Sequence, residues 1–148
     1  MILEKDMENL IYGHEAKGYE YLLELDYDEE YAKICLTHSF LNQDTNCTAG
    51  GIPQEKEIYK YNFIQEYVNH NKNTIYEKMI QLCDLSCKDE MMGLEARLLE
   101  LIIRKGAYEN TQYHVKEAFK LRAEIEDLMS CNLYELFPEM IAYLKPKK

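Results

Sequence analysis

Histidine is the scarcest side chain in this sequence that could bind a metal ion or act as a general base. The chain has four, at His14, His38, His70 and His114. His70 lies in the polar segment 69–73, which predicts a solvated loop side chain. His114 lies near the start of an amphipathic segment, which predicts a surface or boundary position. His14 and His38 are therefore the candidates for chemistry.

The two candidate histidines fall at the ends of two predicted helices. His14 opens one helix, and His38 ends another just before a long polar segment. Adjacent antiparallel helices bring the start of one close to the end of the other, so the two imidazoles can share a site. The spacing alone also allows purely structural roles for both rings.

Asp84 is the third candidate, because it interrupts the apolar run 79–85. An ionised carboxylate at such a position is costly unless it is paired, hydrogen-bonded or bound to a cation. Two other interpretations stay open. Asp84 could pair with Lys88 four residues later, or it could simply face solvent.

The cysteines give a weaker signal. The chain has five, Cys35, Cys47, Cys83, Cys87 and Cys131, without a Cys-x-x-Cys pair that would suggest zinc or a redox couple. Cys83 and Cys87 are four residues apart and share one helical face. We expect them to be small buried hydrophobic residues, with a disulfide or a weak metal site as the alternative.

The elements that must position these side chains are helices. Apolar residues recur at i, i+3, i+4 and i+7 along the chain, whereas strand-like alternation is missing. This pattern predicts an all-α fold, a bundle of about six to seven helices. Helices are expected near 3–11, 14–25, 31–38, 53–68, 74–84, 91–105 and 111–129, with a short piece from 132 past Pro138, a loop over 41–53 and a frayed tail over 145–148.

Three helix boundaries carry clear signals. Thr74 and Glu77 have the spacing of a capping box at a helix start. Asp26 or Asp28 can cap the helix that follows them through a side-chain oxygen. Gly106 follows two basic residues and predicts a helix end.

Composition bounds the class of protein. The length of 148 residues and the 47% apolar content fit one domain over 1–148. With 17 basic and 27 acidic residues the net charge is −10, which repels a phosphate backbone and disfavours nucleic acid. A small phosphorylated molecule can still bind in a cleft with local cations. No membrane span or signal sequence is evident, so we expect a cytoplasmic protein without a membrane partner.

Several segments resemble the middle of an HD-domain protein. They are 14–22, 25–32, 34–40 and 79–84, and the tail segment 132–138 is similar to one uncharacterised bacterial branch of that superfamily. Its members are all-α and are typically metal-dependent phosphohydrolases. Their pattern is an early histidine, an adjacent His-Asp pair, in many members two further histidines, and a final aspartate.

The resemblance implies roles for the three candidates. His14 and His38 match the two further histidines, which bind a second metal ion, and Asp84 matches the final aspartate. Imidazole and carboxylate ligands suit Fe, Mn or Zn, and Mg suits a more oxygen-rich centre. Lys17 and Lys88 are cations that could hold a phosphate, with solvated helix lysines as the alternative.

The resemblance also implies an incomplete site. The segment 1–13 has neither a histidine nor a His-Asp pair. We therefore expect an impaired phosphohydrolase for a nucleotide or another small phosphoester, or alternatively a non-catalytic helical interaction module. Loss of the family's N-terminal helices would uncover an apolar face, so we expect a homodimer through that face. A partner chain could then supply the missing ligands.

Overall fold

The computed structural model describes residues 14–41 and 67–142, and these ranges are helical throughout apart from turns and short connections. They contain no strand, only an isolated antiparallel bridge between Cys87 and Met91. The predicted all-α class is confirmed for the described part of the chain. The helices are α1 (His14–Glu24), α2 (Glu29–Ala32), α3 (Ile34–Thr37), α5 (Ile75–Leu85), α6 (Leu94–Lys105), α7 (Thr111–Met129), α8 (Leu133–Leu136) and α9 (Glu139–Ala142), and residues 67–70 are also helical.

Several expected elements lie outside the described residues. They are the helix at 3–11, most of the loop over 41–53, most of the helix over 53–68, and the tail over 145–148. Within the described ranges, no helix is both long enough and apolar enough to cross a bilayer.

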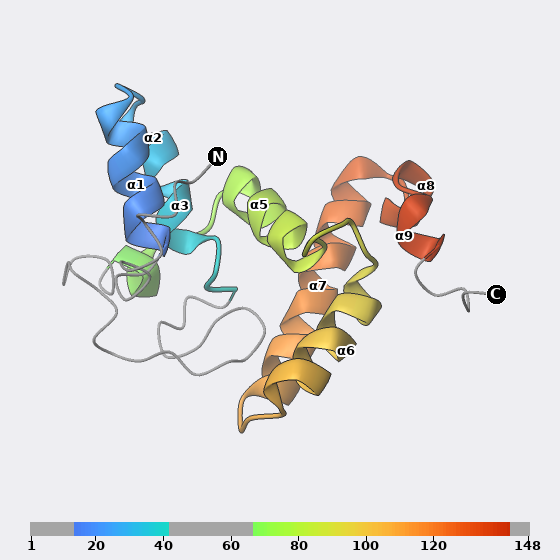
Figure 1. The fold of residues 1–148 in the computed structure, drawn as a ribbon. Coiled ribbons are helices and arrows are strands. Elements are labelled where there is room, and N and C mark those ends of the chain that lie inside the picture. Colours follow the sequence, from blue (N-terminus) through green and yellow to red (C-terminus); the bar gives the residue numbers. More distant parts are fainter. Residues whose placement is uncertain (1–13, 42–66, 143–148) are drawn as a thin grey trace.

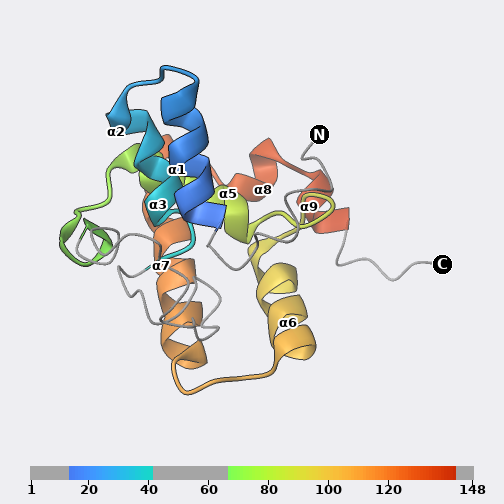
Figure 2. The same cartoon turned by 60° about the vertical axis from the view of Figure 1, so that its left-hand side comes forward.

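The helices form two groups that meet at α5. Figure 1 shows α1, α2 and α3 on one side of α5, and the long pair α6 and α7 with the short α8 and α9 on the other. Figure 2 shows α1 lying along α3, and α3 in turn contacts α5. Helix α5 therefore links the candidate histidines to the larger group.

Each group has its own hydrophobic core. The smaller core consists of Ala16, Leu36, Phe40 and Val68, with Tyr19 and Tyr67 packed against it. The larger core is built from the inward faces of α5, α6 and α7 and from the C-terminal helices. Its buried members are Leu41, Leu82, Leu85, Leu94, Leu98, Ala118, Leu121, Ile125, Leu133 and Met140.

The predicted helix boundaries are largely confirmed. Thr74 and Glu77 form the capping box, with each side chain bonded to the other's backbone N–H. Helix α6 ends at Gly106, whose φ of 89° favours glycine. Helix α7 spans the predicted 111–129.

The predicted cap by Asp26 or Asp28 is only half right. Asp28 is the N-cap residue of α2, but its side chain makes no capping hydrogen bond. Asp26 instead takes the left-handed conformation with a φ of 61°, which turns the chain after α1. The helix expected over 31–38 is divided into α2 and α3 around Lys33. The division leaves α3 as a single turn, which ends immediately before His38.

Candidate functional site

The structure brings His14 and His38 together, as the helix-end argument predicted. His14 is the first residue of α1, and His38 directly follows α3. The two Nε2 atoms are 2.9 Å apart, and the ring centroids are 4.8 Å apart with an interplanar angle of 71°. The side chain of His14 is 64% exposed, so solutes can reach the pair.

A close helix crossing explains why these two rings meet. A Cβ atom on Gly18 would lie 3.0 Å from the Cys35 sulfur, so a larger residue there would push α1 and α3 apart or shift Cys35. His14 lies one turn before Gly18, and His38 lies one turn after Cys35. Because the helices run antiparallel, both rings project from the same end of the crossing. Burial at the crossing raises the pKa of the Cys35 thiol.

The remaining ring nitrogen of each histidine also has a partner. His38 Nδ1 donates a hydrogen bond to the Cys35 carbonyl oxygen at 2.7 Å, which leaves the neutral ring with a lone pair on Nε2. His14 Nδ1 lies 3.5 Å from Oε2 of the buried Glu15, a contact that becomes an ion pair when the ring is protonated. The two Nε2 atoms are within hydrogen-bond distance, so in the neutral pair His14 Nε2 donates to the lone pair on His38 Nε2.

A third polar group lies beside the two ring nitrogens. The nearby Ser39 hydroxyl lies 3.4 Å from His14 Nε2 and 3.2 Å from His38 Nε2. A hydroxyl has one hydrogen to donate, so it satisfies only one of the two nitrogens. A metal ion that displaced the hydrogen between the rings would use both nitrogens as ligands.

The pair also passes a distance test for a metal ion. Imidazole nitrogen binds zinc at about 2.0–2.1 Å, so two nitrogens on one ion lie no more than ~4.2 Å apart. In the tetrahedral geometry of zinc the two nitrogens lie ~3.4 Å apart, so the observed 2.9 Å would widen by roughly 0.5 Å when an ion binds. The bond from His38 Nδ1 to a backbone carbonyl is the kind of outer contact that orients a metal-binding imidazole.

A buried polar network holds the end of α3 against α5. Glu77 is 3% exposed, and its Oε1 accepts hydrogen bonds from Thr37 Oγ1 at 3.0 Å and from Asn71 Nδ2 at 2.7 Å. Gln81 Nε2 donates to the backbone oxygens of Thr37 at 2.8 Å and of Phe40 at 3.3 Å. These bonds bracket His38 on both sides along the chain, so they fix the backbone from which its ring projects.

Asp84 does not complete a three-residue metal group with the histidines. It lies on α5 one turn beyond Gln81, and it is solvent-exposed. Among residues 14–41 and 67–142, no cluster of three or more His, Cys, Asp or Glu side chains could hold a metal ion. The solvent-facing interpretation of Asp84 therefore fits the structure, whereas Lys88 forms its ion pair with Glu100 instead.

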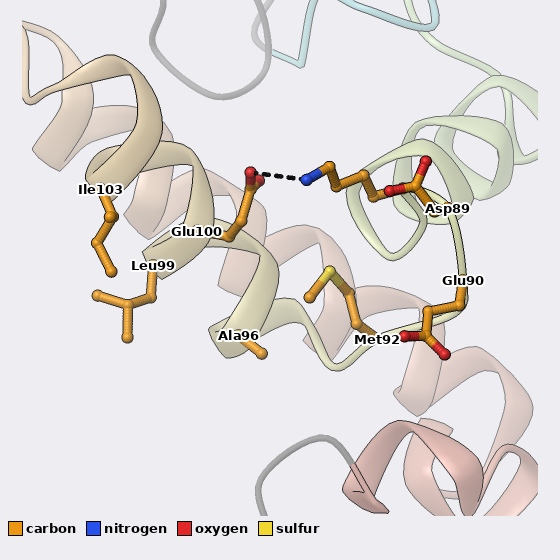
Figure 3. A pocket seen from close by; sticks show the side chains of 8 residues that line it. Asp89, Glu90, Met92, Ala96, Leu99, Glu100 and Ile103 are labelled. Atoms are coloured by element: carbon orange, nitrogen blue, oxygen red, sulfur yellow. Dashed lines mark hydrogen bonds and ion pairs between the residues drawn. The ribbon is translucent and has the colours of Figure 1, made fainter.

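The two lysines proposed for phosphate lie in different surroundings. Lys17 is half-buried on α1, one turn after His14. Lys88 lies beyond α5 and lines a separate hollow of about 300 Å³, which is bounded by the outer face of α6. The dashed line in Figure 3 marks its 3.3 Å contact with Glu100, and Leu99 and Ile103 line the same hollow. Only Lys17 shares a helix with a candidate histidine.

The predicted exposure of the other histidines and of the paired cysteines is only partly confirmed. His70 is exposed, as predicted, but the prediction for His114 is wrong because its ring is 0% exposed. The ring packs inward from α7 and contacts Tyr113 edge-on. Cys83 and Cys87 are free and exposed, so both the buried interpretation and the disulfide are wrong here. Cys83 lies near the end of α5 and Cys87 lies beyond it, where the surface is open.

Sequence reasoning missed Glu15, Ser39 and Glu77 as parts of the site. Glu15 and Ser39 adjoin the two histidines, and this adjacency was the only available signal. Glu77 was identified as a helix-capping residue, and nothing in the capping box indicated its second bond to Thr37.

Comparison with protein families, with curated proteins and with solved structures finds no match to this chain. The assignment of a function therefore rests on the geometry of the site and on the sequence resemblance.

Proposed function

We propose that this chain is an HD-like protein that binds a divalent metal ion between His14 and His38 and acts on a nucleotide or another small phosphoester. The observation that carries the proposal is the 2.9 Å separation of the two Nε2 atoms, with Nδ1 of His38 bonded to a carbonyl and Nδ1 of His14 facing a carboxylate. That arrangement leaves the two converging nitrogens for a cation.

His14 and His38 would hold the ion, with Fe, Mn or Zn suiting the imidazole ligands and Mg a more oxygen-rich centre. When bound, the ion supplies Lewis-acid polarisation of a phosphoryl oxygen and lowers the pKa of a bound water. The chain's own residues orient this site. Ser39 offers a hydroxyl beside both nitrogens, and Lys17 can contribute positive charge for a phosphate from the next turn of α1.

The proposed activity is low, because two imidazoles are fewer than the three protein ligands typical of catalytic zinc sites. Asp84 remains the proposed additional ligand from the family resemblance. A second chain is the other proposed source of ligands. Homodimer formation stays a prediction.

A second candidate function is a non-catalytic helical interaction module. The observation that favours it is an open hollow of about 870 Å³ beside α2, α3 and α5, which is lined by exposed aromatic and aliphatic side chains. This hollow is lined by neither candidate histidine.

Hydrolysis of a generic phosphoester separates the two functions. We would measure p-nitrophenyl phosphate turnover with added Mn²⁺ for the wild type, for the double variant His14→Ala with His38→Ala, and for His70→Ala as a control at an exposed histidine. The phosphohydrolase proposal expects Mn²⁺-dependent turnover that disappears only in the double variant. Absence of turnover in the wild type, or equal turnover in all three proteins, would favour the interaction module.

A further inference from the structure

The hollow beside α2, α3 and α5 has a volume of about 870 Å³, against about 300 Å³ for the hollow beside Lys88. We call it the acidic groove. Its walls are α2 and α3 on one side and the first half of α5 on the other, with Tyr67 between them. This volume lies within the range of ~300–1,000 Å³ that is usual for binding sites.

Much of the surface inside the acidic groove consists of exposed apolar and aromatic side chains. Tyr76 is 68% exposed and Tyr31 is 59% exposed, and Met79 and Ile80 are each about half exposed. These side chains lie on elements that converge on one hollow, so they form a single patch rather than isolated surface residues. Patches of this kind usually mark an interaction site, and methionine adapts its shape to different partners.

Acidic residues lie on one side of the acidic groove. The segment 24–30 contains five acidic residues in seven positions, and Glu29 and Glu30 line the groove itself. Lys33 is the one basic residue among those lining it, and its ammonium is paired with Glu29 at 3.2 Å. Glu30 has no ion-pair partner among the described residues. That side of the acidic groove therefore carries uncompensated negative charge.

This charge selects among occupants. Nucleic acid and anionic bilayer surfaces are repelled by carboxylates. A second copy of this chain also has a net charge of −10, which opposes its approach as a whole. A positively charged partner is attracted instead.

The walls also select the shape of the occupant. They are helices with internally bonded backbones, so they offer no free strand edge to an extended peptide. An apolar groove between helices fits the apolar stripe of an amphipathic helix. We propose that the acidic groove binds an amphipathic helix of a partner protein, with apolar residues at i, i+3 or i+4 and i+7 and with Lys or Arg along the flanks.

The test uses the full chain and a fluorescein-labelled helical peptide built from Leu, Ala and Lys with that spacing, followed by fluorescence anisotropy. The matched peptide carries Glu in place of every Lys. Two variants probe the groove, Glu30→Lys for its charge and Tyr76→Ser for its apolar surface. Two matched controls make the same changes elsewhere, namely Glu109→Lys between α6 and α7 and Tyr113→Ser on α7, where Tyr113 is 53% exposed.

We expect saturable binding of the Lys peptide alone. Each groove variant should weaken it about fivefold or more, and each control less than about twofold, since loss of one of the few dominant contact residues of an interface costs over 1 kcal/mol, or roughly fivefold. Circular dichroism of all four variants checks that they are folded. Equal weakening by a groove variant and its control would overturn the proposal, because it would indicate only attraction to net charge. A dimer that the Lys peptide dissociates would overturn it in favour of self-association.

Discussion

Replacement of Glu77 by alanine should strongly destabilise the fold, because this one carboxylate satisfies three donors. It accepts from Thr37 Oγ1 at 3.0 Å, from Asn71 Nδ2 at 2.7 Å and from the backbone N–H of Thr74 at 2.7 Å. A hydrogen bond to a charged group contributes about 1.5–3 kcal/mol, and a buried donor that loses its partner costs ~1–3 kcal/mol. Desolvation of the buried carboxylate offsets part of the simple sum.

We therefore expect Glu77→Ala to lower the free energy of unfolding by about 3–5 kcal/mol, comparable with the loss of one partner of a buried charged pair. For a chain of this length that corresponds to a fall in Tm of roughly 6–20 °C. Glu77→Gln keeps the size and one carbonyl acceptor, so its loss should be smaller. Glu135→Ala, at an exposed site on α8, is the matched control for the loss of one glutamate.

Urea unfolding followed by circular dichroism measures these differences, with the slope checked for constancy across the variants. A loss below about 1 kcal/mol for Glu77→Ala would refute the reasoning, since a surface substitution usually costs no more than ~0.5 kcal/mol. It would mean that Glu77 does not hold α3 to α5.

Three further predictions concern α6 to α8. Burial and the hydrogen bond to Glu95 raise the pKa of Tyr134 to about 12. In urea unfolding, the wild type should therefore be more stable than Tyr134→Phe below about pH 10. This difference in the free energy of unfolding should shrink as pH rises through 12. The hydrogen bond from Arg104 holds the pKa of Glu100 at about 2. The wild type should therefore have a higher free energy of unfolding than Glu100→Gln above about pH 4.3, and this difference should fade as pH falls toward 2. If the free energy of unfolding varies with pH in the same way for the wild type and a variant, the prediction for that variant is wrong. Gly106→Ala should cost ~1–3 kcal/mol of stability through backbone strain alone, because φ is 89° and a Cβ there contacts nothing within 4 Å, and an unchanged Tm would contradict this.

The long helices of the described part could be predicted from local signals. The capping box at Thr74 and the stop at Gly106 depend on neighbouring residues, and both are present in the structure. The cap at Asp28 could not be predicted in detail, because a side-chain bond depends on rotamer and turn geometry. The left-handed Asp26 that sets this turn has no distinct sequence signal.

Burial was harder to predict than helicity, because it depends on which elements cover a residue. His114 was placed at the surface by its position near a helix start, yet tertiary packing covers it completely. Cys83 and Cys87 show the reverse, since no described element covers their face. The approach of His14 to His38 was predictable from the antiparallel helix ends, whereas the exposed position of Asp84 depends on the rotation of α5.

Metal content tests the central claim most directly. Elemental analysis would be made on protein purified without chelators and without a metal-affinity tag. The wild type, the double variant His14→Ala with His38→Ala, and His70→Ala would be compared. The two-histidine site predicts Fe, Mn or Zn in a near-stoichiometric amount in the wild type and in His70→Ala, with loss in the double variant. No bound metal in the wild type, or the same content in all three proteins, would contradict a metal site at this pair.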